Sequence, residues 1–175
     1  TQKYPSIVTI VQNRNKEHTS MILSDEPNRI WYGNGYIEDK ILGLTFRISA
    51  NSFSQINSFQ VSELYSVAMD MAYLNGTETV IDAYCGTGTI GLISAVNGAK
   101  QVLGIENNPS AVSDAVENAK LNNITNASFV CADASEYLKQ MAKDKQSADV
   151  VFLDPPRSGT DERFLSSVIK LAPKK

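Results

Sequence analysis

The chain has 175 residues, 42% hydrophobic and 20% charged, which is the size and composition of one globular domain or slightly more. Its 2 Cys and 10 Gly exclude a disulfide scaffold or a low-complexity chain, and no apolar run reaches the ~18 residues of a membrane span. The 16 Lys and Arg against 19 Asp and Glu give a net charge of -3, so the chain as a whole is not a basic nucleic-acid clamp.

The ends and the metal-binding residue types add three expectations. The sequence opens without a signal-peptide pattern, which favours a cytoplasmic protein. Cys85, Cys131 and His18 are too few for a zinc site or an iron–sulfur cluster, so we expect no metal. Because the first residue is Thr1 and the last residues follow an apolar helical pattern, we expect a piece of a longer protein.

Residues 1–48 read as a small β-rich segment. Turn signals such as Gly33-Asn34-Gly35 separate the apolar runs, which is typical of antiparallel hairpins. Aromatic side chains on such small sheets belong to the core more often than to a base-stacking surface, and we expect the core. The apolar runs are 7–11, 20–23, 29–32 and 40–48, and the aromatic residues are Trp31, Tyr32, Tyr36 and Phe46.

After residue 48 the period becomes helical. Asn57 is a candidate N-cap, Leu64, Val67, Ala68 and Met71 fall at helical spacing, and Gly76 is a candidate C-cap.

The rest of the chain alternates strand and helix patterns. Four apolar strands separated by crossover helices predict a parallel α/β sheet. The strands are expected at 79–84, 101–106, 127–131 and 148–153, with helices after Gly86 and at 109–121, 135–142 and 161–171.

A glycine-rich turn follows the first of these strands. Residues 85–91 read Cys-Gly-Thr-Gly-Thr-Ile-Gly and satisfy G-x-G-x-x-G, and Glu106 lies 20 residues after Gly86, where a ribose-binding acid is expected. The pattern suits a dinucleotide or S-adenosylmethionine, because both lay a ribose across the same crevice. A tight turn without a ligand is the alternative.

Asp82, four residues before the first glycine, favours the methyl donor. A carboxylate there opposes the phosphates of a dinucleotide, whereas S-adenosylmethionine carries an ammonium and a sulfonium. A helix-capping or turn-bonding role for Asp82 is equally consistent with the sequence.

Further polar residues follow the carboxyl ends of the strands, where ligands bind in open α/β sheets. Tyr84, Glu106, Asp133 and Asp154 therefore converge on one crevice. We expect Glu106 on the ribose hydroxyls, Asp133 near the adenine amino group and Asp154 near the methionyl end.

At these residues the chain resembles the S-adenosylmethionine-dependent RNA uracil-C5 methyltransferases, which make 5-methyluridine in ribosomal and transfer RNA. The matching blocks are 53–57, Phe-Ser-Gln-Ile-Asn; 82–89, Asp-Ala-Tyr-Cys-Gly-Thr-Gly-Thr; 104–106 with the 111–123 helix; and 154–159, Asp-Pro-Pro-Arg-Ser-Gly.

The resemblance implies a Rossmann-like methyltransferase domain at 49–175, partial and with four parallel strands, preceded by the β-rich segment at 1–48. It implies S-adenosyl-L-methionine as cofactor. The implied cofactor-binding residues are Gln55, Tyr84, Gly86, Gly88, Thr89, Glu106, Asp133 and Asp154.

Methylation of uracil C5 needs a thiolate that adds at C6 and a base that removes the C5 proton. Cys85 lies in the cofactor turn, and Cys131 in an apolar strand where thiols are usually buried, so neither suits the nucleophile. The resemblance implies that the nucleophilic cysteine and the base, a glutamate, come after Lys175. We therefore expect no catalytic residue in this chain, which would be a cofactor-binding fragment.

The implied partner is RNA, with 23S ribosomal RNA first and transfer RNA second, while the oligomeric state stays open. Residues 49–175 hold ten Lys and Arg against fourteen Asp and Glu, so most RNA contacts are expected elsewhere, with Arg157 as a candidate here. The alternatives are an RNA or DNA amino-methyltransferase, disfavoured by Arg157 where an aromatic residue is expected, a dinucleotide-dependent oxidoreductase, and a non-catalytic binding module.

Overall fold

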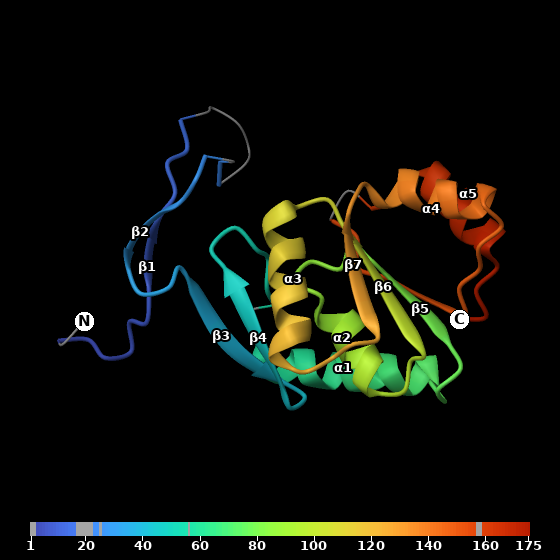
Figure 1. Ribbon diagram of the computed structural model, residues 1–175, viewed down its shortest axis with the longest axis horizontal. Coiled ribbons are helices and arrows are strands. Elements are labelled where there is room, and N and C mark those ends of the chain that lie inside the picture. The colour runs from blue at the N-terminus through green and yellow to red at the C-terminus, as the bar shows by residue number, and fades with distance from the viewer. Residues whose placement is uncertain (1–2, 17–22, 25, 56, 157–158) are drawn as a thin grey trace.

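The computed structural model describes residues 3–16, 23–24, 26–55, 57–156 and 159–175 (Figure 1). Most of the predicted run 20–23, and also Arg157 and His18, lie outside the described residues. The elements are β1 (Ile10–Gln12), β2 (Arg29–Tyr32), β3 (Tyr36–Ile41), β4 (Leu44–Ser49), α1 (Ser58–Ala72), β5 (Thr79–Ala83), α2 (Thr89–Val96), β6 (Gln101–Glu106), α3 (Pro109–Leu121), β7 (Ala127–Cys131), α4 (Ala134–Lys143), β8 (Val150–Leu153) and α5 (Glu162–Leu171).

The centre of the fold is a four-stranded parallel sheet, as the alternating strand and helix patterns predicted, and its strand order is β7-β6-β5-β8. Ala83 pairs with Ile105 on one side and Leu153 on the other, and Glu106 pairs with Cys131. All four strands therefore end at one edge, which is where a ligand crevice forms in such sheets.

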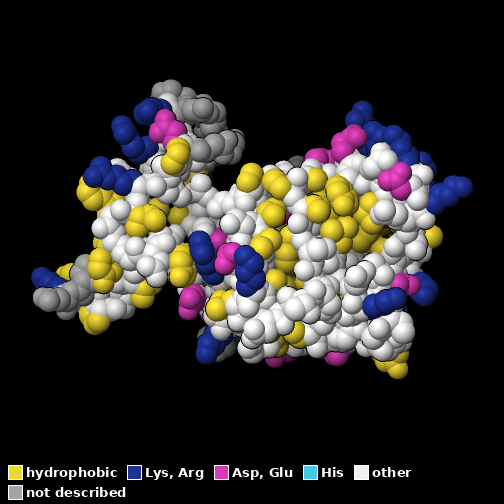
Figure 2. Space-filling model, viewed as in Figure 1, with side chains coloured by type: hydrophobic (Ala, Val, Ile, Leu, Met, Phe, Trp, Pro, Cys, Tyr) yellow, Lys and Arg dark blue, Asp and Glu magenta, His cyan; other side chains and the backbone are white. Residues whose placement is uncertain are grey.

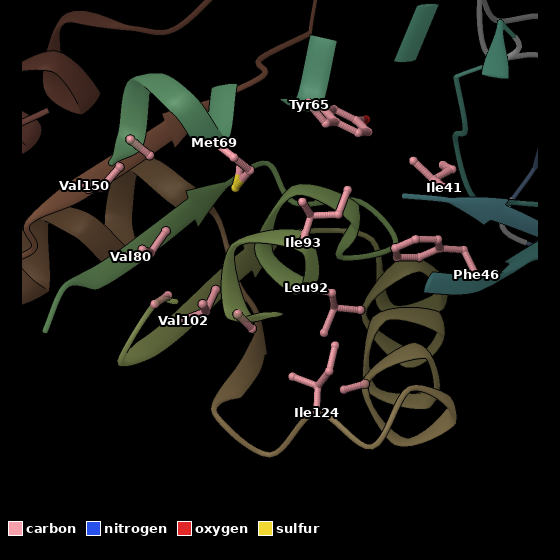
Figure 3. Close-up of a cluster of buried hydrophobic side chains, with 14 of the residues drawn as sticks. Ile41, Phe46, Tyr65, Met69, Val80, Leu92, Ile93, Val102, Ile124 and Val150 are labelled. Atoms are coloured by element: carbon pink, nitrogen blue, oxygen red, sulfur yellow. The ribbon is translucent and has the colours of Figure 1, made fainter. Parts of the chain in front are cut away.

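Helices cover both faces of this sheet, α1, α2 and α3 on one and α4 and α5 on the other (Figure 1). Along β5, Val80 points into the first buried cluster, whereas Ile81 and Ala83 point into the second, because successive side chains of a strand face opposite ways. Figure 3 shows the first cluster, in which Leu92 and Ile93 of α2 lie between the sheet and the β3–β4 hairpin.

The β-rich segment differs from its prediction in its pairing. The run 40–48 is two antiparallel strands, β3 and β4, because Leu42 and Gly43 form a turn with φ of 48° and 83°. The turn at Gly33 and Gly35 does not close a hairpin, since β2 pairs with β1 and not with β3.

The aromatic residues of this segment do not share one environment. Phe46 is 1% exposed and belongs to the core, as expected. Trp31 and Tyr32 are 56% and 44% exposed, so the expectation that they are core residues is wrong. The cause is that β1 and β2 form a separate two-stranded ribbon, which offers no second layer in which to bury them.

Helix α1 begins as predicted, with the Asn57 side chain accepting the N–H of Gln60. It ends earlier than predicted, at Ala72, with Tyr73 rather than Gly76 as the C-cap. The stripe that packs inward is Val61, Tyr65, Met69 and Ala72, whereas the predicted apolar positions Leu64, Val67 and Met71 are exposed.

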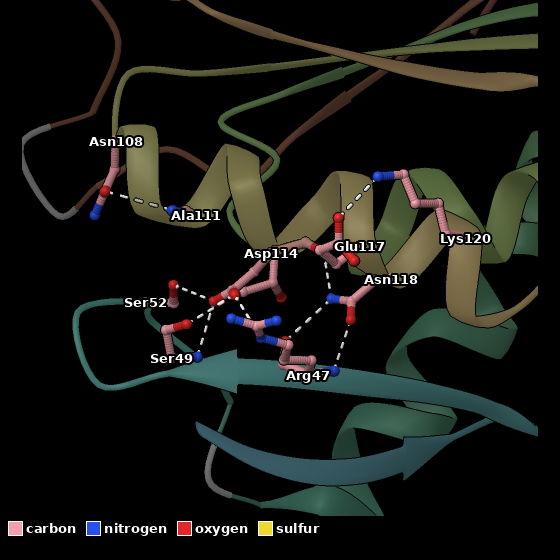
Figure 4. Close-up of polar contacts among 10 residues, drawn as sticks. Arg47, Ser49, Ser52, Asn108, Ala111, Asp114, Glu117, Asn118 and Lys120 are labelled. Atoms are coloured by element: carbon pink, nitrogen blue, oxygen red, sulfur yellow. Dashed lines mark hydrogen bonds and ion pairs between the residues drawn. The ribbon is translucent and has the colours of Figure 1, made fainter. Parts of the chain in front are cut away.

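Polar side chains of α3 bind the free edge of β4 (Figure 4). Asn118 accepts the N–H of Arg47 at 2.6 Å and donates to its carbonyl at 3.1 Å, and Asn122 makes the same pair of bonds to Thr45. Asp114 accepts the N–H and hydroxyl of Ser49. The β3–β4 hairpin is thus held against the sheet domain.

The last residues of the chain lie along the outer edge of β8. Lys175 donates its N–H to the carbonyl of Asp149 and accepts the N–H of Val151, which is the hydrogen-bond pattern of neighbouring parallel strands. Among the described residues, no helix combines the length and the apolar character needed to cross a membrane.

Candidate functional site

A small cavity of about 50 Å³ lies at the carboxyl end of β5. Five predicted site residues line it: Gln55, Tyr84, Gly86, Thr89 and Asp154. The other lining residues, which the sequence analysis did not assign to the site or considered in another role, are Ile41, Phe53, Ser54, Tyr65, Asp82, Cys85, Thr87 and Ile90.

The glycine turn is tightly built. Gly88 has a φ of 81°, and a Cβ there would lie 2.9 Å from the Phe129 ring and 3.0 Å from Ala115. Only glycine fits this position, since side chains both disfavour the φ and need the space. Tyr84 also has a positive φ, of 64°, which holds its ring 5.5 Å from that of Phe164.

Glu106 closes one side of this turn. One carboxylate oxygen accepts the N–H of Gly86 at 3.0 Å, and the other accepts the N–H of Asn108 at 2.8 Å. Glu106 does not line the small cavity, but the two bonds fix its carboxylate beside the glycine turn, with lone pairs left for a ligand hydroxyl.

Asp82 is a buried carboxylate, 1% exposed, and it is bonded on one side only. Its Oδ2 accepts the N–H of Gly91 in α2 at 2.7 Å, whereas its Oδ1 has no partner among the described residues. The helix-bonding role allowed by the sequence is therefore present. Burial, and then the charges of Asp154 and Glu106, raise the pKa of Asp82 to about 7.

The cavity wall is acidic. It contains Asp82 and Asp154, and none of its described lining residues is a lysine, arginine or histidine. The same carboxylates act on the hydroxyl of Tyr65. Burial, and then the negative charges of Asp154 and Asp82, raise its pKa to about 12. Such a site favours a cation over a phosphate.

Besides Glu106, two predicted residues do not line the cavity, Asp133 and Gly88. Asp133 is exposed and caps α4, where its carboxylate accepts the N–H of Glu136 at 3.0 Å. Gly88 packs inward against Phe129, so its contribution is the shape of the turn. Tyr65 is the main residue that sequence reasoning missed, and its only signal was its place on the buried stripe of α1.

Neither cysteine presents an exposed thiol to the cavity, because Cys85 lines it but is buried and Cys131 does not line it. Cys85 is 8% exposed, and burial raises the pKa of its thiol well above the ordinary range. Cys131 is exposed, so its expected burial is wrong; it ends β7, and its Sγ lies 3.6 Å from the carbonyl of Asn107. Among the residues that the structure describes, no group of three metal-ligating side chains is found.

Comparison with known proteins identifies similar sequences and structures. A family model described as a methyltransferase domain matches residues 74–174. Proteins named uncharacterized RNA methyltransferase from Lactiplantibacillus plantarum and Staphylococcus aureus MSSA476 are 46% and 43% identical over 98% of this chain. The chain spans only 37% and 38% of their respective lengths.

Solved structures agree on the fold. The Pyrococcus abyssi tRNA (uracil-54, C5)-methyltransferase, solved with S-adenosyl-L-homocysteine, matches with a TM-score of 0.77 and 28% identity over 99% of this chain and 41% of its own. A SAM-dependent methyltransferase from Agrobacterium tumefaciens matches with a TM-score of 0.66 and 18% identity over 83% of this chain and 52% of its own. The fold is therefore the Rossmann-like fold of S-adenosylmethionine-dependent methyltransferases.

Proposed function

From the premise that the chain belongs to the methyltransferase-domain family, we propose that it holds S-adenosylmethionine at the β5 crevice of an enzyme that methylates C5 of uridine in RNA. The observation that carries the cofactor assignment is the acidic wall with the unpartnered Oδ1 of buried Asp82. A buried carboxylate oxygen without a partner is costly, and a cationic ligand group satisfies it.

Each crevice residue has a proposed task. The fixed carboxylate of Glu106 accepts hydrogen bonds from the ribose hydroxyls. Gln55, Tyr84 and Asp154, which share the cavity wall, hold the methionyl end, while Gly86, Gly88 and Thr89 shape the turn beneath it. Asp133 reads the adenine amino group from the start of α4. When bound, the cofactor supplies an electrophilic methyl group.

The RNA assignment is supported by relatives and by motifs. The relatives are named RNA methyltransferases, and the Pyrococcus abyssi protein is named for uracil-54 C5 of tRNA. The blocks at 53–57 and 154–159 resemble the uracil-C5 family. We propose ribosomal RNA as the first candidate substrate, 23S in particular, with transfer RNA as the second.

The methyl-transfer step at uracil C5 needs a reactive thiolate. The buried Cys85 does not offer one, because its thiol keeps its proton at neutral pH. We place the nucleophile and the base in a part of the protein outside these residues, which accords with the 37% of a relative's length that the chain spans.

Calorimetric titration with S-adenosylhomocysteine and, separately, with a nicotinamide dinucleotide tests the cofactor assignment. We expect binding of the first only, lost in Glu106→Ala and Asp154→Ala and kept in Glu117→Ala, whose carboxylate lies away from the crevice and pairs with Lys120. Binding of the dinucleotide instead would show that the crevice belongs to an oxidoreductase. Binding of neither would contradict the proposal for this chain.

A further inference from the structure

A second cavity lies between α4 and α5, on the sheet face opposite to α1 and α2. It has a volume of about 420 Å³, and four of its lining side chains are cationic: Lys139, Lys143, Arg163 and Lys170. Glu162 is its one acidic residue, and Ala142, Ser166 and Ser167 complete the lining. Figure 2 shows Lys and Arg side chains gathered over these two helices. We call this cavity the α4–α5 groove.

Most cations of the groove have no partner. Lys139 pairs with Glu136 at 2.9 Å, whereas the side chains of Lys143, Arg163 and Lys170 make no ion pair or hydrogen bond with any described residue. Elsewhere Lys120 and Lys174 pair with carboxylates. Like charges gathered on a chain of net charge -3 repel one another, and an anionic ligand removes that repulsion.

The α5 side of the groove starts with Glu162 and Arg163, at the edge of the sheet that carries the proposed cofactor crevice. Helices α4 and α5 start from the N-caps Asp133 and Asp161, at the carboxyl edge of the sheet. The hydroxyl of Ser135 bonds to Asp161 at 3.2 Å, and the Tyr84 ring lies 5.5 Å from the Phe164 ring of α5. The groove follows α5 from Glu162 to Lys170, whereas on α4 only the second half of the helix, from Lys139 to Lys143, lines it.

The spacing of the cations suits a run of phosphates. At 1.5 Å per residue, Lys139 and Lys143 are about 6 Å apart along α4, and Arg163 and Lys170 are about 10 Å apart along α5. A helical nucleic-acid strand carries one phosphate per about 3.4 Å, so this length faces about three phosphates.

We propose that the α4–α5 groove binds the phosphodiester backbone of the RNA substrate. This inference rests on the proposed function, and it adds an RNA contact on this chain that the sequence, with its acidic balance, did not indicate. The groove positions RNA and reads no base, since its contacts are to phosphate.

The test is the salt dependence of binding of a fluorescent single-stranded uridine-containing RNA to the full chain. In Lys143→Gln with Lys170→Gln we expect binding weakened on the order of tenfold at 0.1 M salt, and a log–log salt slope smaller by about 1.4. The control variant Lys40→Gln with Lys100→Gln removes the same number of charges outside the groove, and it should leave the RNA affinity and the salt slope unchanged. Lys143→Arg with Lys170→Arg should restore the wild-type slope.

Equal losses in the groove and control pairs would overturn the proposal, because the attraction would then be diffuse. It would also be overturned if polyglutamate or inorganic phosphate at the RNA's phosphate concentration displaced the RNA fully, since the groove would then take any anion. S-adenosylhomocysteine titration of the same variants separates the two proposals: the groove pair should keep wild-type affinity for it, whereas failure of the cofactor proposal appears as no binding even in wild type.

Discussion

At Asp82, burial and neighbouring charge oppose the ionisation of a carboxyl group. Its carboxyl has an ordinary pKa of 3.8, and burial with the neighbouring Asp154 and Glu106 raises it to about 7. Between these two values the native state keeps a proton that the unfolded chain has released. Stability from this group is therefore complete below about pH 4 and falls as pH rises to about 7.

Asp82→Asn should remove this dependence, because an amide does not titrate. One pKa unit corresponds to about 1.4 kcal/mol, so the unfolding free energy of the variant relative to wild type should rise by a few kcal/mol between pH 4 and pH 8. Urea unfolding at the two pH values measures it, with Asp70→Asn, an exposed residue of α1, as control. Parallel pH profiles of wild type and Asp82→Asn would contradict the raised pKa.

The candidate site was predictable where a motif fixed both the residue type and its place in the chain. Tyr84, Gly86 and Thr89 belong to the glycine block, and Gln55 and Asp154 belong to the resembling blocks, and all five line one cavity. Tyr65 was not predictable, because its place in the site depends on which stripe of α1 packs inward. The exposure of Cys131 was missed because an apolar strand pattern does not show that β7 lies at the edge of the sheet.

Helix α3 and its C-cap carry a row of polar residues at four-residue spacing, Asp114, Asn118 and Asn122, that replaces a neighbouring strand for β4. Asn118 has one more bond, from its Nδ2 to the carbonyl of Thr87 in the glycine turn at 3.1 Å. It is fully buried, whereas Asn122 is only half-buried. Asn118 therefore connects the β3–β4 hairpin to the glycine turn.

Asn118→Ala should cost about 3 kcal/mol of unfolding free energy, because it leaves the buried carbonyl of Thr87 and the partly buried backbone groups of Arg47 unpaired, at about 1–3 kcal/mol each. It should also weaken S-adenosylhomocysteine binding, since the turn loses its anchor. Asn122→Ala is the matched control: water reaches its site, so we expect about 1 kcal/mol and unchanged ligand affinity. Urea unfolding measures the loss of stability, and calorimetry measures the S-adenosylhomocysteine affinity. Equal ligand affinity in the two variants would contradict the coupling between Asn118 and the glycine turn.

Element prediction succeeded where local signals agreed with packing. Strand β6 and helix α3 have their predicted bounds, because a parallel strand buried on both faces is continuously apolar and Asn108-Pro109 is a strong helix start. The run 40–48 failed because its turn, Leu42-Gly43, contains an apolar residue. In α1 two apolar stripes compete, and only tertiary packing selects between them.

The choice of stripe has a measurable consequence. Leu64→Ala on the exposed stripe of α1 should change the unfolding free energy by no more than about 0.5 kcal/mol. Leu92→Ala, in the fully buried contact between α2 and the sheet, should cost about 2–5 kcal/mol. A large cost at Leu64 in a chemical unfolding experiment would mean that the predicted stripe, and not the one observed, faces the core.

At the scale of the whole molecule, the β-rich segment is two different structures. The buried clusters of the described residues begin at Ile41, so the β1–β2 ribbon contributes nothing to them. It is tied to the remainder by the bond from Asn28 to Asn51, at 2.8 Å, and by the bond from the N–H of Gly35 to the Thr9 hydroxyl, at 2.9 Å. The β3–β4 hairpin, in contrast, places Ile41 and Phe46 in the same core as α1 and α2. The apolar runs and turn signals predicted one β-rich segment and did not separate the ribbon from the hairpin, because a strand pattern does not reveal what the strand packs against.

Two truncations test where the folding unit begins, and with it the predicted boundary between residues 48 and 49. Removal of residues 1–34 takes away the ribbon only, so the unfolding free energy should fall by no more than about 1 kcal/mol, a shift of roughly 2–4 °C in Tm. S-adenosylhomocysteine affinity should be unchanged, because residues 1–34 do not line the crevice.

Removal of residues 1–48 should instead unfold most of the chain. It deletes Phe46, whose burial alone is worth about 3–5 kcal/mol, and it removes Arg47, which pairs with the buried side chains of Asp114 and Asn118. Together these losses approach the 5–15 kcal/mol, roughly, that holds a typical domain folded. Calorimetric unfolding of the two truncated chains decides between the boundaries. If residues 49–175 melt as cooperatively and at the same temperature as residues 35–175, the hairpin is an accessory; otherwise it belongs to the cofactor domain, and the boundary lies near Gly35.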